Sequence, residues 1–115
     1  MKTILVIGRD WKFRALLRAQ LREENFAALG CETLEEAGEQ LDSGSPSPAA
    51  LVFDTTDTDA AETRPQLIAL AARLPVMVVA AAHQDFPSLP LHIERRPLRL
   101  EALVSAVKTL VAPYK

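Results

Sequence analysis

The order of patterns along the chain predicts an α/β fold: a flavodoxin-like three-layer sandwich around a five-stranded parallel sheet with strand order 2-1-3-4-5. Short apolar runs of strand length alternate with segments whose apolar residues recur at helical spacing, as in parallel strands joined by helical crossovers. A hydrophobic fraction of 49% with only 5% aromatic residues indicates an aliphatic core. Asp54 follows the apolar residues 51–53 without a spacer, as expected where a buried strand ends at a functional edge.

Length and composition predict a single domain, residues 1–115, that buries a core without disulfides. The net charge is -2 and the basic residues are scattered, so we expect no direct nucleic-acid partner. The longest apolar run, residues 74–82, contains Pro75 and is too short for a membrane span. The N-terminus has no signal-peptide layout, and we expect a cytoplasmic protein without membrane contact. Cys31 is the only cysteine, which excludes an internal disulfide and a cysteine-based metal cage.

The first half of the chain gives two strands and two helices. Residues 3–7 are an apolar, β-branched run that predicts a buried first strand. Asp10 is placed to cap a helix that runs to about Glu24. Residues 26–31 predict a weaker strand at a sheet edge, and the capping box at residues 33–36 starts a short second helix.

Residues 50–53 predict the third strand. We expect the following helix to start near residues 63–65, because a start as early as Asp59 would place Pro65 inside the helix, where it removes an internal hydrogen bond. The continuous apolar run 76–82 is typical of a central strand covered on both faces.

The connection after that strand is short. Residues 83–90 include Pro87 and Pro90 and are too few for a helical crossover, so we expect a loop or single turn, with the fourth helix shortened or missing. Residues 91–94 predict a last strand, and an amphipathic helix follows Pro97.

The predicted strand order has a topological switch point between strands one and three, where ligands bind in such sheets. Gly8, Arg9 and Asp10 are therefore the expected neighbours of Asp54. Trp11 is expected to pack on the end of the sheet at the start of the first helix.

Four segments share one pattern: residues 4–7 with 13–17, residues 51–54, residues 75–79, and residues 96–97 with 100–103. Together they resemble the receiver domain of two-component response regulators, over nearly the whole chain. The resemblance implies a signalling module rather than an enzyme, with Asp54 at the phosphoacceptor position and a histidine kinase, an output domain or a second receiver as partner.

The chain departs from the family at the positions that surround this aspartate. The resemblance implies two acidic residues that bind Mg²⁺ with the phosphoacceptor, a Ser or Thr at the end of strand four, a Lys before the proline, and an aromatic residue on strand five. These positions hold Gly8 and Arg9, Ala80, Arg96 and Ile93, respectively. The pattern is that of a degenerate receiver, or pseudo-receiver.

The substitutions change what the site can bind. Glycine has no ligand atom and Arg9 is a permanent cation, so we expect no cofactor and weak or absent metal binding; any metal would depend on Asp10 and Asp54. A guanidinium matches a carboxylate in shape and charge, so Arg9, Arg96 or both are candidates to hold Asp54 in a permanent salt bridge. Thr56 is a further expected neighbour of the site.

Three interpretations of Asp54 remain open from the sequence: a vestigial site locked by arginine, a phosphoacceptor of low efficiency, and a solvated strand-end residue. The first predicts a phosphorylation-independent binding module that acts or dimerises through the fourth strand, the fifth strand and the last helix. The second predicts a Mg²⁺-dependent phosphoacceptor switch. In a third possibility, the chain is the front end of a longer protein with an output domain.

Overall fold

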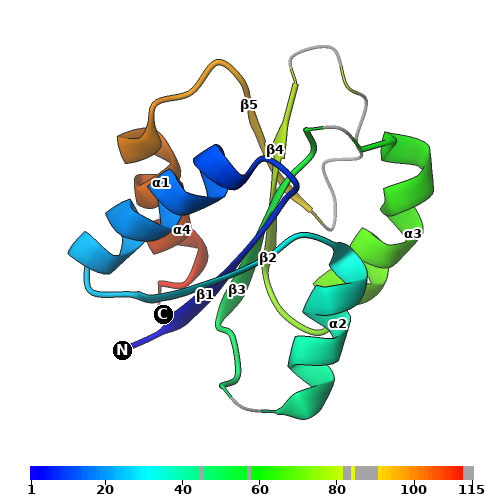
Figure 1. Cartoon of the computed structure of the whole chain (residues 1–115), viewed down its shortest axis with the longest axis horizontal. Helices are drawn as coiled ribbons and strands as arrows, with labels where there is room; N and C mark the ends of the chain where they lie inside the picture. Colours follow the sequence, from blue (N-terminus) through cyan, green and yellow to red (C-terminus); the bar gives the residue numbers. More distant parts are fainter. Residues whose placement is uncertain (45, 57, 82–83, 85–90, 113–115) are drawn as a thin grey trace.

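The computed structural model describes residues 1–44, 46–56, 58–81, 84 and 91–112. Within them, five parallel strands form one sheet in the order β2-β1-β3-β4-β5, and four helices cover it, which confirms the predicted fold class (Figure 1). No helix of these residues combines the length and apolar character needed to cross a membrane. The elements are β1 (Thr3–Ile7), α1 (Trp11–Glu23), β2 (Ala27–Cys31), α2 (Leu34–Ser43), β3 (Ala50–Asp54), α3 (Ala60–Ala71), β4 (Val76–Ala80), β5 (His92–Arg95) and α4 (Leu100–Leu110).

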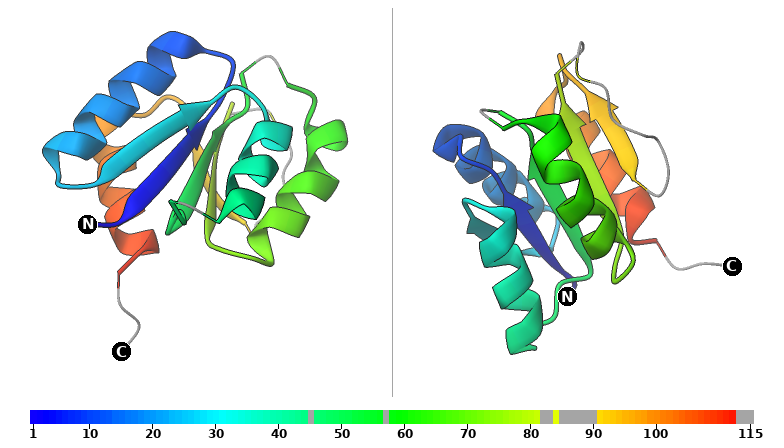
Figure 2. Two further views of the ribbon diagram at one scale, coloured as in Figure 1. Left: turned by 60° about the horizontal axis from the view of Figure 1, so that its bottom comes forward. Right: turned by 90° about the vertical axis from the view of Figure 1, so that its right-hand side faces the viewer.

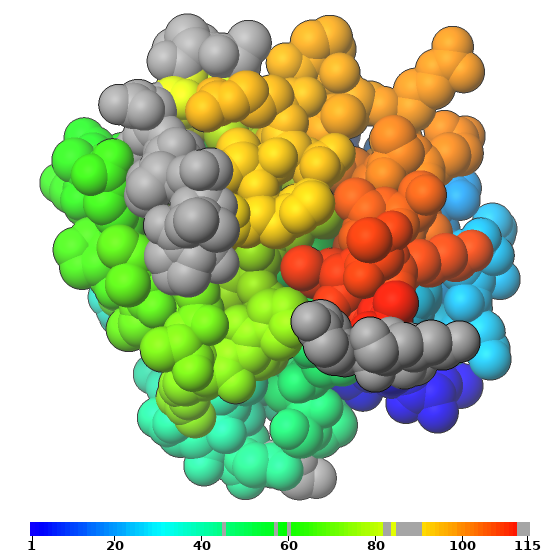
Figure 3. All heavy atoms as spheres, turned by 180° about the vertical axis from the view of Figure 1, so that it is seen from behind, coloured from blue at the N-terminus to red at the C-terminus, as the bar shows by residue number. Residues whose placement is uncertain are grey.

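The helices lie in two layers, with α1 and α4 on one face of the sheet and α2 and α3 on the other (Figure 2). Alternate residues of each strand point to opposite faces, so the core has two halves. On β3, Leu51 and Phe53 pack toward α2 and α3, whereas Val52 packs toward α1 and α4. Figure 3 shows the side of the molecule where α4 and β5 lie next to each other at the surface.

The first two helices begin where their caps predict. The Asp10 carboxylate accepts hydrogen bonds from the backbone N–H groups of Lys12 and Phe13, at 3.1 and 3.3 Å. The Thr33 hydroxyl accepts from the Glu36 N–H at 3.2 Å. Each cap satisfies donors that a helix leaves unpaired in its first turn.

The prediction for the start of α3 is wrong. The helix begins at Ala60, and Pro65 lies inside it. Asp59 caps it by accepting from the N–H groups of Ala61 and Glu62, at 2.8 and 3.2 Å. Proline removes one backbone donor from the helix, whereas an aspartate cap satisfies two, which is a reason why the longer helix is compatible with this sequence.

The predicted bounds of β4 and β5 can be compared with the structure, whereas most of the predicted loop between them cannot. β4 ends at Ala80, two residues earlier than predicted, and β5 is shifted by one residue. The predicted loop over residues 83–90 lies outside the described residues except for Gln84, so the shortened or missing helix stays a prediction.

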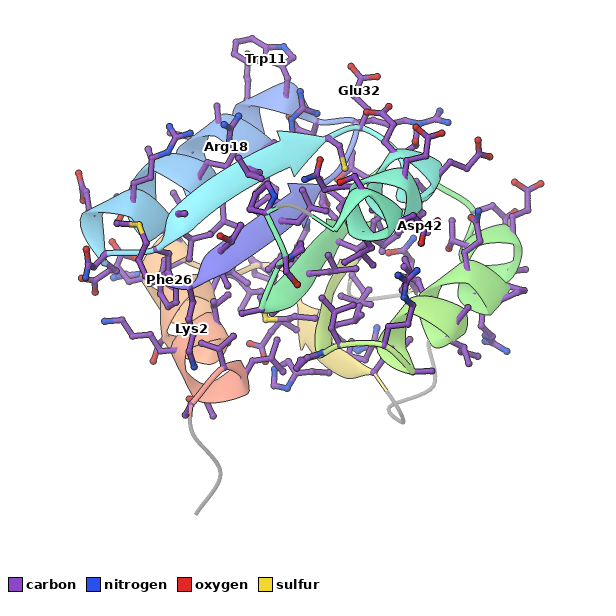
Figure 4. The ribbon with its side chains drawn as sticks, turned by 90° about the horizontal axis from the view of Figure 1, so that it is seen from below. Lys2, Trp11, Arg18, Phe26, Glu32 and Asp42 are labelled. Atoms are coloured by element: carbon purple, nitrogen blue, oxygen red, sulfur yellow. The ribbon has the colours of Figure 1, made fainter. Side chains whose placement is uncertain are left out.

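Trp11 does not pack on the end of the sheet. Its side chain is 64% exposed and projects away from the molecule at the start of α1 (Figure 4). The side of α1 that faces the sheet is set by Leu17 and Leu21, which are fully buried. Trp11 lies off this stripe, because 3.6 residues per turn place it on the flank of the helix, about 100° around the axis from the midpoint of Leu17 and Leu21.

Candidate functional site

Asp54 is the last residue of β3 and lies at the carboxyl edge of the sheet. Only 1% of it is exposed. It pairs in register with Val79 of β4, while Ile7 of β1 pairs with Phe53. Gly8 therefore follows β1 directly beside Asp54, as the predicted switch point requires.

Arg96 forms an ion pair with this buried carboxylate. Its Nη2 lies 2.8 Å from Asp54 Oδ1, and its guanidinium carbon lies 4.7 Å from the centre of the Phe13 ring on α1. Its backbone N–H donates to the Ala80 carbonyl of β4 at 2.9 Å. The Arg96 side chain is 36% exposed. The charge is thus held between a carboxylate and an aromatic face, both of which favour a guanidinium.

Thr56 completes the contacts of Asp54 Oδ1. Its N–H donates to this oxygen at 3.2 Å and its hydroxyl at 2.9 Å. Oδ1 therefore accepts three hydrogen bonds, one from the Arg96 guanidinium and two from the backbone and side chain of Thr56. The oxygen has no remaining lone pair for a further strong partner.

The second oxygen, Asp54 Oδ2, is buried and has no hydrogen-bond partner among the described residues. It lies toward Gly8, where an added Cβ would be 3.0 Å from Asp54 Cβ and 3.4 Å from Oδ2. A side chain at position 8 would therefore require Asp54 to shift. The close approach of the two strands explains the glycine in steric terms.

The two residues after Gly8 do not join the site as partners of the carboxylate. Arg9 is exposed and lines a separate pocket of about 280 Å³ with Glu32 and Glu35, so of the two candidate arginines it is Arg96 that pairs with Asp54. Asp10 is engaged as the cap of α1. The sequence predicted that both residues lie near the switch point, but it did not predict where their side chains point.

Ala80 and Ile93 occupy the positions of the hydroxyl and the aromatic residue that the resemblance implies. Ala80 is fully buried at the end of β4. Ile93 is partly buried and packs against the core half covered by α2 and α3. Neither residue supplies a hydrogen-bonding side chain to the edge of the sheet that carries Asp54.

The donor set around Asp54 does not fit a divalent cation such as Mg²⁺, which requires several oxygen ligands. The described residues contain no group of three His, Cys, Asp or Glu side chains arranged to hold a metal. Oδ1 is paired with a guanidinium, Asp10 is occupied by a helix cap, and Gly8 has no side chain to supply a ligand atom.

Two residues at this edge were not found from the sequence. Phe13 of α1 lies under the Arg96 guanidinium. Thr55 is only 3% exposed; its hydroxyl lies 3.1 Å from the Val79 carbonyl oxygen and also contacts Gln84. No local sequence pattern marks either residue, because each makes its contact with a residue far away in the chain.

Comparison with known proteins supports the fold. No protein-family model and no curated protein sequence matches the chain. Among solved structures, a protein of Chloroflexus aurantiacus J-10-fl assigned as a response regulator is 20% identical, with a TM-score of 0.78 over 97% of this chain and 98% of that one. A two-component response regulator of Clostridium difficile is 19% identical, with a TM-score of 0.76 over 96% of each chain.

The same fold also occurs as part of a larger enzyme. The lysine decarboxylase LdcF of Francisella novicida is 18% identical to this chain, with a TM-score of 0.71 over 96% of this chain and 17% of the enzyme. A shared fold at this level of identity does not fix a function. The five-stranded sheet, its order and its helices show that this chain has the fold of response regulator receiver domains.

Proposed function

We propose that this chain is a receiver-like module of a two-component type signalling system, independent of phosphorylation and acting through protein–protein interaction. The observation that carries the proposal is the ion pair between buried Asp54 and Arg96. Under this proposal the module has no catalytic activity and no cofactor, and it acts in the cytoplasm.

The first support is the state of the nucleophile. Phosphoryl transfer to a carboxylate brings two anions together and needs metal or cationic groups directed at the incoming phosphoryl group. Here the cation of Arg96 is held on Asp54 Oδ1 itself, and Oδ2 is buried against Gly8. A phosphoryl donor would have to displace the pair before either oxygen reacted.

The second support is the lack of a switch element at the expected positions. A modification changes the conformation of a protein only by favouring one of two states that an element can adopt. Ala80 offers no hydroxyl to a phosphoryl group on Asp54, and Ile93 offers no ring to move with it. The proposed module therefore presents one constant surface.

A second candidate function is a phosphoacceptor receiver modified on Asp54 with Mg²⁺. The observation that favours it is the unpartnered Oδ2, a buried acceptor atom of the kind that proteins usually satisfy. Under this alternative, Arg96 would have to leave Oδ1 as the metal binds.

From the fold we propose partners by class of protein, not as individual proteins. They are a histidine kinase, an output domain or another receiver; one solved structure with this fold is the receiver domain of the hybrid histidine kinase CckA. A second copy of the chain is a further candidate partner.

The two candidates differ in their response to metal and beryllofluoride. We expect backbone amide shifts of Gly8, Asp54 and Thr56 to stay unchanged when Mg²⁺ and then beryllofluoride are added to the ¹⁵N-labelled chain. An Asp54→Asn variant is the control for nonspecific effects. Saturable shifts at millimolar metal that this variant abolishes would reject the proposal in favour of the phosphoacceptor.

A further inference from the structure

The two helices that flank the edge strand β2 carry opposite charges. α1 has four basic side chains and one acidic, whereas α2 has four acidic side chains and no basic one. They lie on opposite faces of the sheet, on either side of β2 (Figure 2). Because both helices return from the carboxyl edge of a parallel sheet, they run in the same direction.

A basic ridge of three arginines, Arg14, Arg18 and Arg22, follows α1 at intervals of four residues. Arg18 Nε and Arg22 Nη2 lie 3.2 and 3.1 Å from the Ala28 carbonyl oxygen of β2, and Arg14 donates to the Gly8 carbonyl. Figure 4 shows Arg18 lying over β2. Backbone acceptors therefore fix the positions of all three guanidinium groups.

The stems of this ridge depend on Gly30 of β2. An added Cβ there would lie 3.1 Å from Cδ of both Arg14 and Arg18. A larger residue would push the two side chains off the strand. The glycine near the end of the edge strand thus lets Arg14 and Arg18 lie flat along it.

No carboxylate among the described residues is in direct contact with the basic ridge. Among the described residues, none of its three arginines forms an ion pair. Burial, followed by the neighbouring charges of Arg22 and Arg14, lowers the pKa of Arg18 from its ordinary value. Three fixed cations that repel one another would be stabilised by a set of carboxylates placed against them.

The acidic side chains that complement the basic ridge lie on α2, on the other side of the edge strand β2. A groove of about 460 Å³ runs along β2 and is lined by Leu29, Gly30 and Cys31, with Arg18 on the α1 side. Its α2 side is formed by polar residues at helical spacing: Glu36, Glu39, Gln40 and Ser43. The two glutamates of this set are the acidic ridge. The surface is thus basic on one side of β2 and acidic on the other.

We propose that a second copy of this chain docks along the β2 edge, with the basic ridge of each copy against the acidic ridge of the other. A two-fold axis parallel to β2 makes both contacts at once, because a symmetric dimer uses the same patch twice. This goes beyond the proposed function, which names no surface. It also differs from the surface of β4, β5 and the last helix that the sequence analysis favoured.

The alternative edge-to-edge arrangement is disfavoured. A two-fold axis perpendicular to the sheet would pair the two β2 strands and place α1 beside the α1 of the other copy, which brings the two basic ridges together. The outward Ala28 carbonyl, which such pairing would need, is already bound by Arg18 and Arg22.

The test is a charge-reversal experiment followed by sedimentation equilibrium. The wild-type chain is expected to reach twice its monomer mass of 12.6 kDa at low salt and to dissociate as salt rises. Arg18→Glu and Glu39→Arg are each expected to weaken self-association by more than about tenfold, since each places like charges together at both contacts. An equimolar mixture of the two variants is expected to form a heterodimer, because both contacts then pair opposite charges.

The matched control is Arg99→Glu, the same charge reversal at an exposed position before α4. It is expected to leave the dimer unchanged. A wild-type chain that stays monomeric at millimolar concentration and low salt would overturn the proposal. So would a dimer that dissociates with Arg99→Glu, or two reversed variants that fail to associate with each other although both are folded by circular dichroism.

Discussion

At the residue scale, the partners in the Asp54–Arg96 pair are unequally exposed. Asp54 is 1% exposed and Arg96 is 36% exposed. Removing the arginine leaves a mostly buried carboxylate without its counter-ion, whereas removing the carboxylate leaves a cation that can turn toward solvent. The cost of breaking the pair therefore depends on which side is removed.

We expect Arg96→Ala to lower the free energy of unfolding by about 2 to 3 kcal/mol, between the values for exposed and fully buried pairs. Arg9→Ala, an arginine at an exposed position of the same edge, is the matched control and should change it by less than about 0.5 kcal/mol. Urea denaturation measures both. Equal effects of the two variants would contradict the assignment of Arg96 as the partner.

The double variant Arg96→Ala with Asp54→Asn tests the cause of this cost. Asparagine removes the buried charge, so the double variant should be more stable than Arg96→Ala alone, by about 1 kcal/mol or more. If the double variant is less stable than Arg96→Ala, the loss in Arg96→Ala comes from packing on Phe13 rather than from the uncompensated carboxylate.

Cys31, at the end of β2, should be an unreactive thiol. Burial, and after it the Glu36 carboxylate, raise its pKa from 9.0 to about 11. At pH 8 the native thiol is then alkylated about a hundredfold more slowly than in the urea-unfolded chain, in proportion to its thiolate fraction. Iodoacetamide labelling followed by mass spectrometry measures the two rates.

The same pKa shift predicts the direction of a pH effect on stability. The unfolded thiol ionises first as the pH rises, so the contribution of Cys31 is constant below pH 9 and is lost between pH 9 and about 11. A Cys31→Ala variant should lack this component. Comparable alkylation rates in the native and unfolded chain would contradict both expectations.

At the scale of the element, α3 is the helix that the sequence mispredicted. Pro65 lies inside it, where its ring nitrogen gives no hydrogen bond. The cap by Asp59 and the burial of Leu67 and Leu70 belong to the same helix. The helix forms because its cap and its apolar face are satisfied together, which the proline alone did not indicate.

Pro65→Ala should therefore stabilise the protein, by about 1 to 3 kcal/mol, since alanine restores a backbone donor in a helix interior. Gln66→Ala, at the next exposed position of α3, is the control for a general effect of alanine and should change stability by less than about 0.5 kcal/mol. Thermal denaturation followed by circular dichroism measures both. A destabilised Pro65→Ala variant would mean that the proline has a packing role.

At the scale of the whole molecule, binding of a ligand to the folded state alone must raise its stability. If Mg²⁺ bound with a dissociation constant of about 1 mM, 10 mM would add about 1.4 kcal/mol. We expect no change in melting temperature, because the described donor set offers too few ligands. Ca²⁺ at the same concentration is the control for ionic strength, and a rise specific to Mg²⁺ would contradict the expectation.

The topology could be predicted because its signals are local. An apolar run, a cap or a change of period reports on its own segment, and the rules for parallel sheets convert the series of segments into one strand order. The same rules place the end of β3 beside the end of β1, and hence Asp54 beside Gly8. The errors at Pro65 and Trp11 are errors about helix ends, where local signals compete.

The sequence by itself determined the sheet, its order and the aspartate at its edge, together with the absence of the acidic pair, the hydroxyl and the aromatic residue around it. Only the tertiary structure decided which arginine holds Asp54. Arg96 is 42 residues from it in the chain, and the Phe13 ring under the guanidinium comes from a third segment. A pair formed by such distant residues depends on side-chain direction after folding, which composition and spacing do not encode.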